Sequence, residues 1–280
     1  MLAQRVATAV VAIPIVVAAL LLGPWAIAAL VMLLAVGAGF EAFRLLRQAG
    51  YPVLPWLGTA LGVALVLAGA LAHGQEDKTF LFLTIGALLV ALGAFGRRDS
   101  HDGLAAWAIT TFGGLYVGLL GFVPRLAGAD ITVDVGSRLA PWLDGGRWWL
   151  VIAVLGVWTY DTGAYFAGKA IGGPRFLTAI SPSKTWAGAV GGLTATTLVT
   201  AGLLAALGRS PLEGLLVGPL IAVAAQTGDL AESMLKRSAE AKDSGTLFPG
   251  HGGVLDRVDS LLFAVPAVYL YLVASGAIAR

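Results

Sequence analysis

The chain has 280 residues, of which 58% are hydrophobic and only 12% are charged, and its mean hydropathy is +0.85. A soluble domain of this length carries about 25% charged residues, so the composition excludes an ordinary soluble enzyme and indicates an integral membrane protein. The formal net charge is +2, and the absence of cysteine excludes disulfides and thiolate metal sites.

Apolar stretches of about 20 residues, long enough to cross a hydrocarbon core of ~30 Å, recur along the whole chain. The predicted fold is therefore all-α and polytopic, with about nine transmembrane helices. We predict these spans at about residues 6–22, 25–46, 54–72, 79–96, 104–124, 148–168, 185–208, 212–235 and 258–277.

The polar residues inside the spans divide the chain into two regions of one continuous membrane domain. Residues 1–100 carry few of them, so we expect these helices to be a scaffold or an oligomer surface. Residues 101–280 form the predicted catalytic region.

The distribution of Lys and Arg predicts the orientation in the membrane, because cytoplasmic loops carry an excess of these residues. With the N-terminus in the cytoplasm, 12 of the 18 Lys and Arg residues fall on the cytoplasmic side. The outer side keeps the other six, which are Lys78, Arg125, Arg138, Arg147, Arg209 and Arg280. We therefore expect a multi-pass protein of the cell membrane whose charged motifs face the cytoplasm.

The sixth predicted span contains an acid at membrane depth. Asp161 and Tyr165 lie one helical turn apart within Trp158 to Lys169, on the same face of the predicted helix. An acid in this position faces protein or water rather than lipid. A substrate contact and a simple interhelical hydrogen bond are both compatible with this pattern.

The loop before the seventh span reads Ser-Pro-Ser-Lys-Thr-Trp from Ser181 to Trp186. It offers hydroxyl groups and the cation of Lys184 at a helix N-terminus, where exposed amides and the helix dipole attract anions. The alternative is an ordinary helix cap by Ser181 or Ser183.

Carboxylates gather at the end of the eighth span and the start of the ninth. On a helix, Asp229, Glu232, Ser233 and Lys236 share one face, and Asp256 and Asp259 share another. Carboxylate oxygens from two antiparallel helices suit Mg²⁺ rather than a soft metal. The alternative is a cluster of interhelical salt bridges, such as Asp229 with Arg257 or Asp259 with Lys236.

The loop between these spans combines Lys242-Asp243-Ser244-Gly245 with Pro249-Gly250-His251-Gly252-Gly253. Glycines allow backbone amides to turn toward phosphate oxygens, and the nearby cations supply compensating charge. A flexible turn that contacts anionic lipid headgroups is the alternative. The coincidence of carboxylates, cations and glycines favours a site for phosphate and metal.

The segment from Ser233 to Asp259 resembles the C-terminal motif of phosphatidate cytidylyltransferases (CDP-diacylglycerol synthases). The resemblance rests on Lys-Arg at 236–237, Lys-Asp at 242–243, Pro-Gly-His-Gly-Gly at 249–253 and Asp-Arg-Val-Asp at 256–259. Asp-x-Gly-Ala-Tyr from Asp161 and Ser-Pro-x-Lys-Thr-Trp from Ser181 resemble two further family elements in the expected order. Ser183 departs from the family, whose members often carry a basic residue there.

The resemblance implies that CTP and phosphatidic acid react to CDP-diacylglycerol and pyrophosphate with Mg²⁺, and with a second metal ion as a further option. It implies metal binding by Asp229, Asp256 and Asp259. Catalytic roles fall to Asp229, Asp256, Lys236, Arg237, Lys242, His251 and Arg257. Substrate contacts fall to Asp161, Tyr165, Ser181, Lys184, Thr185, Ser233, Gly252 and Gly253. A phosphate monoester is already ionised at neutral pH, so we expect His251 to donate hydrogen bonds rather than act as a base.

The expected partners are CTP, phosphatidic acid, membrane lipids and a second copy of the chain in a homodimer, with no nucleic acid. Two alternative functions are weighed against this one. A secondary transporter also carries polar residues at membrane depth, but no inverted repeat is evident in the sequence. A CDP-alcohol phosphotransferase would carry an Asp-x-x-Asp-Gly-x-x-Ala-Arg run, which the chain lacks.

Overall fold

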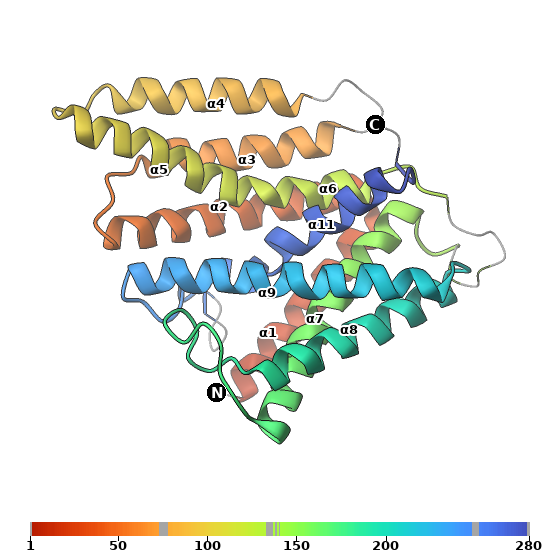
Figure 1. Ribbon diagram of the computed structural model, residues 1–280. Helices are drawn as coiled ribbons and strands as arrows, with labels where there is room; N and C mark the ends of the chain where they lie inside the picture. Colours follow the sequence, from red (N-terminus) through yellow and green to blue (C-terminus); the bar gives the residue numbers. More distant parts are fainter. Residues whose placement is uncertain are drawn as a thin grey trace. The chain divides into compact units, whose positions relative to one another are not determined.

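The computed structural model describes residues 2–72, 78–132, 137, 139, 141–247 and 252–278. Its helices follow one another in the order shown in Figure 1, and the described residues contain no β-strand. The chain divides into two compact units. Unit 1 comprises residues 1–128 and 234–258, and unit 2 comprises residues 129–233 and 259–280.

Unit 1 contains the helices of the N-terminal part of the chain. They are α1 (Leu2–Leu22), α2 (Pro24–Gln48), α3 (Pro55–Leu71), α4 (Thr79–Ala94), α5 (Ser100–Gly118), the 3₁₀ turn η1 (Leu119–Gly121) and α6 (Phe122–Ala127). Pro24 and Pro55 stand at the first positions of α2 and α3, where the missing amide hydrogen costs no hydrogen bond. The short helix α10 (Leu255–Val258) packs against α2 in the same unit.

One apolar cluster of unit 1 forms where α2 meets the following loop. Phe43, Leu46 and Val53 are buried together, and Ile109 and Leu235 pack against them. Helix α3 packs against both α2 and α5. The end of α9 thus packs, through Leu235, against residues of the N-terminal region.

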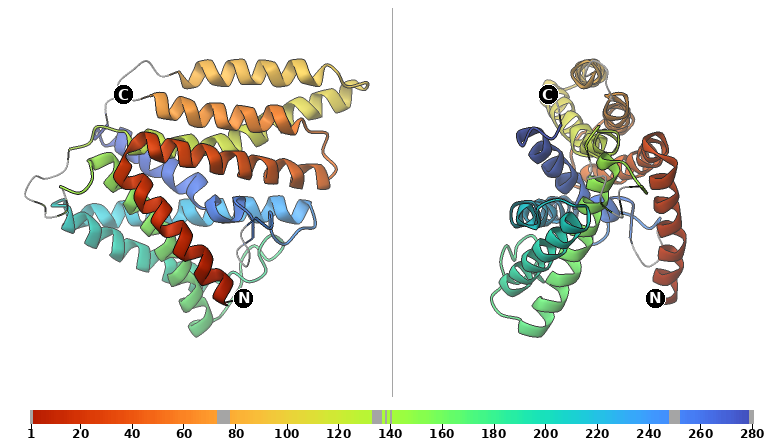
Figure 2. Two further views of the ribbon diagram at one scale, coloured as in Figure 1. Left: turned by 180° about the vertical axis from the view of Figure 1, so that it is seen from behind. Right: turned by 90° about the vertical axis from the view of Figure 1, so that its right-hand side faces the viewer.

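Unit 2 is built on α7 (Gly145–Ile171) and α8 (Trp186–Ala206), which pack side by side. Figure 2 shows the pair from two further directions. The 3₁₀ turn η2 (Pro211–Glu213) leads into α9 (Gly214–Ser238), whose last residues belong to unit 1, and α11 (Leu261–Ala274) packs against α7. Gly188, Gly191 and Gly192 of α8 face α7, as expected for helices that approach closely in a membrane.

A second group of polar contacts in unit 2, separate from the carboxylates of α9, is centred on Glu213. Glu213 accepts two hydrogen bonds of 2.9 Å from the Arg209 guanidinium and one of 2.8 Å from the Tyr271 hydroxyl. The hydrogen bond to Glu213 raises the pKa of Arg209 above its usual value. The guanidinium also lies 5.3 Å from the centre of the Trp149 ring. These contacts satisfy the charges of both side chains within the protein.

The nine predicted spans are confirmed as helices within a few residues at each end. Six helical segments of the described chain are long and apolar enough to cross a membrane: 24–48, 100–127, 145–171, 186–206, 211–238 and 255–274. Val10–Leu22, Pro55–Leu71 and Thr79–Ala94 are shorter apolar helices. The architecture is thus that of a polytopic all-α membrane protein.

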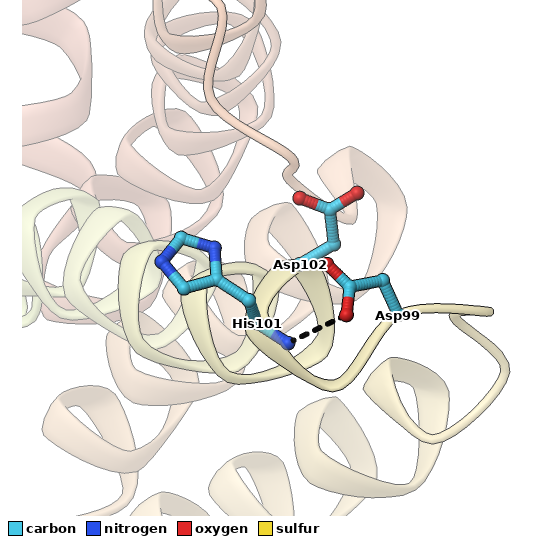
Figure 3. A group of neighbouring side chains, drawn as sticks. All are labelled: Asp99, His101 and Asp102. Carbon is cyan, nitrogen blue, oxygen red and sulfur yellow. Dashed lines mark hydrogen bonds between the residues drawn. The ribbon is translucent and has the colours of Figure 1, made fainter.

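Helix α5 begins with an exposed cap that contains a histidine. Asp99 precedes the helix, and its carboxylate accepts a hydrogen bond from the His101 amide at 3.4 Å (Figure 3). Asp102 completes a group whose potential ligand atoms lie within 4.8 Å of one another. All three residues are exposed. Helix capping accounts for Asp99, and none of the three residues belongs to the motifs that resemble the family.

Candidate active site

The loop between α7 and α8 places Lys184 and Thr185 at the start of α8. Arg175 and Thr185 form an isolated β-bridge, and the Phe176 amide donates a hydrogen bond to the Lys184 carbonyl at 3.2 Å. Thr185 is the cap of α8, because its hydroxyl accepts from the Gly188 amide at 3.1 Å. The alternative of a helix cap by Ser181 or Ser183 is therefore wrong, because Thr185 supplies the cap, and Ser181 is buried within the loop.

Lys184 and Asp229 form an ion pair between this loop and α9. The Lys184 ammonium nitrogen lies 2.5 Å from Asp229 Oδ2, and Ser233 donates to Asp229 Oδ1 at 3.3 Å. The Lys184 side chain is 17% exposed and that of Asp229 is 33% exposed. The two predicted site residues are thus in direct contact, with the carboxylate still accessible.

Three carboxylates of unit 2 come together at Asp229. One carboxylate oxygen from each of Asp229, Glu232 and Asp259 lies within 4.8 Å of the other two. Glu232 is completely buried, whereas the other two are partly exposed. Asp229 and Asp259 were predicted as metal ligands, and Glu232 was placed on the same helix face but not assigned to the metal. Like charges this close repel one another, so the cluster favours a compensating cation.

A pocket of about 350 Å³ adjoins this cluster in unit 2. Charged and polar groups in its wall come from three predicted motifs: Asp161, Tyr165, Lys169, Ser183, Lys184, Thr185 and Asp229. Tyr160, Phe176 and Gln226 add aromatic and amide groups, and small residues such as Ala164 and Gly188 complete the wall. The Lys169 ammonium lies 5.7 Å from the centre of the Tyr165 ring. The structure thus brings the polar patch of the sixth span and the Ser-Pro-Ser-Lys-Thr loop to one cavity.

In unit 1, Asp256 is the centre of a hydrogen-bond network. The Lys236 ammonium lies 2.7 Å from Asp256 Oδ1. Oδ2 accepts from the amides of Ser244 at 2.9 Å and Gly253 at 2.8 Å, and it lies 2.9 Å from the Ser244 hydroxyl. The Asp256 side chain is only 8% exposed. Asp256 therefore holds together the two ends, Ser244 and Gly253, of the glycine-rich segment (residues 244–253).

Glu41 of α2 completes this network from the N-terminal part of the chain. Its carboxylate accepts from the amides of Val254 at 3.0 Å and Leu255 at 2.9 Å, and it lies 2.8 Å from the buried Ser244 hydroxyl. Arg44, one turn further along α2, donates to the Ser244 carbonyl. Backbone amides that the sequence analysis assigned to phosphate thus already donate to protein carboxylates.

The other predicted cations of this segment are exposed. Arg237, Lys242 and Arg257 present their side chains to the surroundings of unit 1. Gly252 has a φ of +83°, a conformation that favours glycine. His251 lies outside the described residues, as do Pro249 and Gly250. The roles predicted for these residues stay predictions.

Comparison with known proteins places these motifs in a family. The model of the cytidylyltransferase family matches residues 3–275. The chain belongs to the cytidylyltransferase family. This result confirms the resemblance found in the sequence, and it extends the match to the N-terminal helices, which resembled the family only in their hydropathy.

The chain is also similar to curated proteins named phosphatidate cytidylyltransferase. The protein from Synechocystis is 34% identical over 293 residues, which cover 96% of either chain. The protein from Brucella suis is 50% identical over 118 residues, or 41% of this chain and 43% of the relative. The Bacillus subtilis protein is 42% identical over 130 residues, or 45% of this chain and 48% of the relative. The latter two alignments span less than half of the relatives' length.

In this member of the cytidylyltransferase family, three features of the site were not predicted from the sequence: the contacts of Glu41, the contacts of Arg44 and the burial of Glu232. Glu41 and Arg44 form the polar end of an otherwise apolar helix, and their three-residue spacing was the signal that two polar groups share a face. The partners lie about 200 positions away in the chain, so no local pattern identified them. Glu232 was recognised as a neighbour of Asp229 on the helix, but its complete burial is visible only in the structure.

Proposed function

We propose that the protein transfers the cytidylyl group of CTP to phosphatidic acid and releases pyrophosphate, which forms CDP-diacylglycerol. The observation that carries this proposal is the contact between Lys184 and Asp229 at the wall of the unit 2 pocket. A cation, carboxylates and a cavity at the end of apolar helices are what two phosphate-bearing substrates need, when one is water-soluble and the other is a lipid. Membership of the family and the names of the relatives support the same reaction.

The chemistry requires two polyanions to meet. A phosphate oxygen of the lipid attacks the α-phosphorus of CTP, a new P–O bond forms, and the bond to the pyrophosphate oxygen breaks in line with it. The lipid phosphate is already ionised, so no general base is needed for the attack. We assign Lys184 to a phosphate group beside Asp229, because a cation at this position lowers the repulsion between the substrates and stabilises charge on the leaving group. Lys236, Arg237, Lys242 and Arg257 are proposed to contact phosphates as well.

A divalent cation fits the carboxylates of unit 2. Asp229, Glu232 and Asp259 provide hard oxygen donors, and no thiolate competes with them because the chain lacks cysteine. We propose that Asp229 and Asp259 hold Mg²⁺ with Glu232 beside them, and that the ion orients phosphate oxygens and withdraws charge from them. Asp256 is kept as a further predicted ligand, and a second ion stays a prediction.

The orientation predicted from Lys and Arg places the site at the cytoplasmic side of the cell membrane. This proposal agrees with the substrates, because CTP is available in the cytoplasm and the lipid is available in the membrane. Residues 1–100 are proposed as a scaffold that contacts the glycine-rich segment through Glu41. The homodimer stays a prediction. CDP-alcohol phosphotransfer and secondary transport are not favoured by the family match.

The test is an assay of the purified full-length protein in detergent micelles that contain dioleoyl phosphatidic acid, with labelled CTP and Mg²⁺. We expect labelled CDP-diacylglycerol and an equal amount of pyrophosphate. Asp229→Asn should reduce the turnover at least 100-fold, whereas Asp102→Asn, which changes an exposed carboxylate of α5, should retain it. Absence of the lipid product from the wild type, or near-normal turnover of Asp229→Asn, would overturn the proposal.

A further inference from the structure

Gln226 of α9 is an amide side chain at the wall of the unit 2 pocket, and it has no part in the chemistry described above. Its Oε1 accepts a hydrogen bond of 2.5 Å from the Tyr160 hydroxyl of α7. Its amide nitrogen is buried and has no hydrogen-bond partner among the residues that the structure describes. A buried donor without an acceptor costs free energy in a membrane protein as in a soluble one, so Gln226 is expected to have a partner in the working enzyme.

The position of Gln226 along α9 indicates what kind of partner this is. The helix has no polar side chain from Gly214 to Ala225, and Gln226 is the first. Asp229 follows three residues later, about 4.5 Å further along the helix axis. The order along α9 is therefore an apolar half, an amide, and then the acid that pairs with Lys184.

A diacyl lipid has the same order of groups along its length. Its acyl chains end in ester groups, whose carbonyl oxygens accept hydrogen bonds and donate none, and the phosphate follows beyond the glycerol. If the lipid phosphate lies beside Lys184, an ester carbonyl falls about one helical turn toward the apolar half of α9. This is the level of the Gln226 amide nitrogen.

The residues of the pocket wall support the same orientation of the lipid, with its phosphate near the cations and its ester groups near Gln226. Along α7, Lys169 stands nine residues after Tyr160, about 13.5 Å away along the axis, so the pocket has a cationic end and an amide end. Gln226 belongs to the amide end, because its side chain is bonded to Tyr160. A charged triphosphate suits the cationic end, and a neutral acceptor suits the other.

We propose that the Gln226 amide donates a hydrogen bond to an ester carbonyl of the phosphatidic acid substrate, and that Tyr160 orients the amide for this contact. Tyr160 is a positioning residue, because its hydroxyl holds Oε1 and leaves the nitrogen as the donor for the lipid. The proposal rests on the proposed function and adds a contact that distinguishes ester-linked from ether-linked lipids. The oxygen of an ether-linked lipid is a far weaker hydrogen-bond acceptor than an ester carbonyl, and it does not occupy the position of the carbonyl oxygen.

The experiment compares dioleoyl phosphatidic acid with its dialkyl ether analogue of equal chain length, in the same detergent micelles. The wild type should show a kcat/KM about three- to tenfold lower for the ether lipid, the usual range for one hydrogen bond. Gln226→Met, which keeps the length of the side chain but lacks the donor, should lose about the same factor with the ester lipid. It should lose no more than twofold with the ether lipid.

Control variants keep the test decisive. Thr227→Val changes an exposed neighbour whose hydroxyl bonds to the Val223 carbonyl of its own helix, and it should preserve the preference for the ester lipid. Tyr160→Phe should weaken that preference by a smaller factor than Gln226→Met does. Tyr160→Phe also replaces Gln226→Met in the comparison if the latter fails to give a monodisperse protein.

The possible results separate this inference from the proposed function. No turnover of the wild type with either lipid contradicts the proposed function itself. Equal use of both lipids by the wild type, or equal loss with both lipids in Gln226→Met, overturns the ester contact while the proposed function stands. A rise in the KM for CTP alone, with an altered preference for CTP over UTP, would assign the amide to the nucleotide base and likewise overturn it.

Discussion

Glu41 and Ser244 are 203 positions apart in the chain, and the Ser244 hydroxyl lies 2.8 Å from a Glu41 carboxylate oxygen. The same carboxylate receives the amides of Val254 and Leu255, so a helix of the N-terminal region holds both ends of the glycine-rich segment. Helix α2 therefore has a structural role in holding the motif, which the composition of the N-terminal region did not indicate. Through these contacts α2 helps to shape the motif.

Removal of the Glu41 carboxylate is expected to release the glycine-rich segment. Glu41→Ala leaves the backbone amides of Val254 and Leu255 without their acceptor, and each such loss costs about 1–3 kcal/mol. We expect a clear fall in the melting temperature in detergent and a turnover reduced at least tenfold. Asp102→Asn, which changes an exposed carboxylate of α5, is the control and should alter neither quantity. An unchanged melting temperature of Glu41→Ala would contradict this role.

Gly253 is required at its position because the Glu41 carboxylate occupies the space where a side chain would begin. A Cβ at Gly253 would overlap both the Glu41 carboxylate and the Ser244 hydroxyl. Gly253→Ala should therefore lower the melting temperature and the turnover together. Gly202→Ala in α8 is the matched control, because nothing lies within 4 Å of a Cβ there and alanine favours a helix. A wild-type melting temperature for Gly253→Ala would show that the segment adapts without cost.

The sequence predicted the helices well and the contacts of the site less well. Membrane spans follow from apolar length, a local property, so all nine appeared near their observed positions. The face shared by Asp229 and Glu232 also followed from helical periodicity. The partner of each charged side chain could not be predicted in this way. Salt bridges between helices depend on how each helix is rotated about its axis and how deep it lies, and no sequence pattern gives either. Lys236 pairs with Asp256 and Lys184 with Asp229, where spacing alone had suggested Asp259 and Arg257 as alternatives.

Gly228 is expected to control the position of Asp259. It lies in α9 beside the backbone of the residues that precede α11, where a Cβ would overlap the Asp259 carbonyl and lie 3.0 Å from the Ser260 Cα. Gly228→Ala should push Asp259 away from Asp229 and Glu232, and should raise the Mg²⁺ concentration needed for half-maximal turnover severalfold. Gly202→Ala again provides the control in a neighbouring helix. An unchanged Mg²⁺ requirement would remove Asp259 from the proposed metal site.

The Lys236–Asp256 pair allows a test of Asp256, the predicted metal ligand that lies in unit 1. If Asp256 contacts the ion during turnover, Asp256→Asn removes a charged ligand as well as the partner of Lys236. We then expect both a lower melting temperature and a Mg²⁺ requirement raised at least fivefold, measured by titration of the initial rate. Lys236→Met separates the two effects, because it breaks the ion pair and leaves the carboxylate in place. Its melting temperature should fall, while its Mg²⁺ requirement should stay near that of the wild type or decrease, since no ammonium competes with the ion. A Mg²⁺ requirement that does not change in Asp256→Asn would instead restrict Asp256 to holding the amides of Ser244 and Gly253, and the metal would be left to the carboxylates of unit 2.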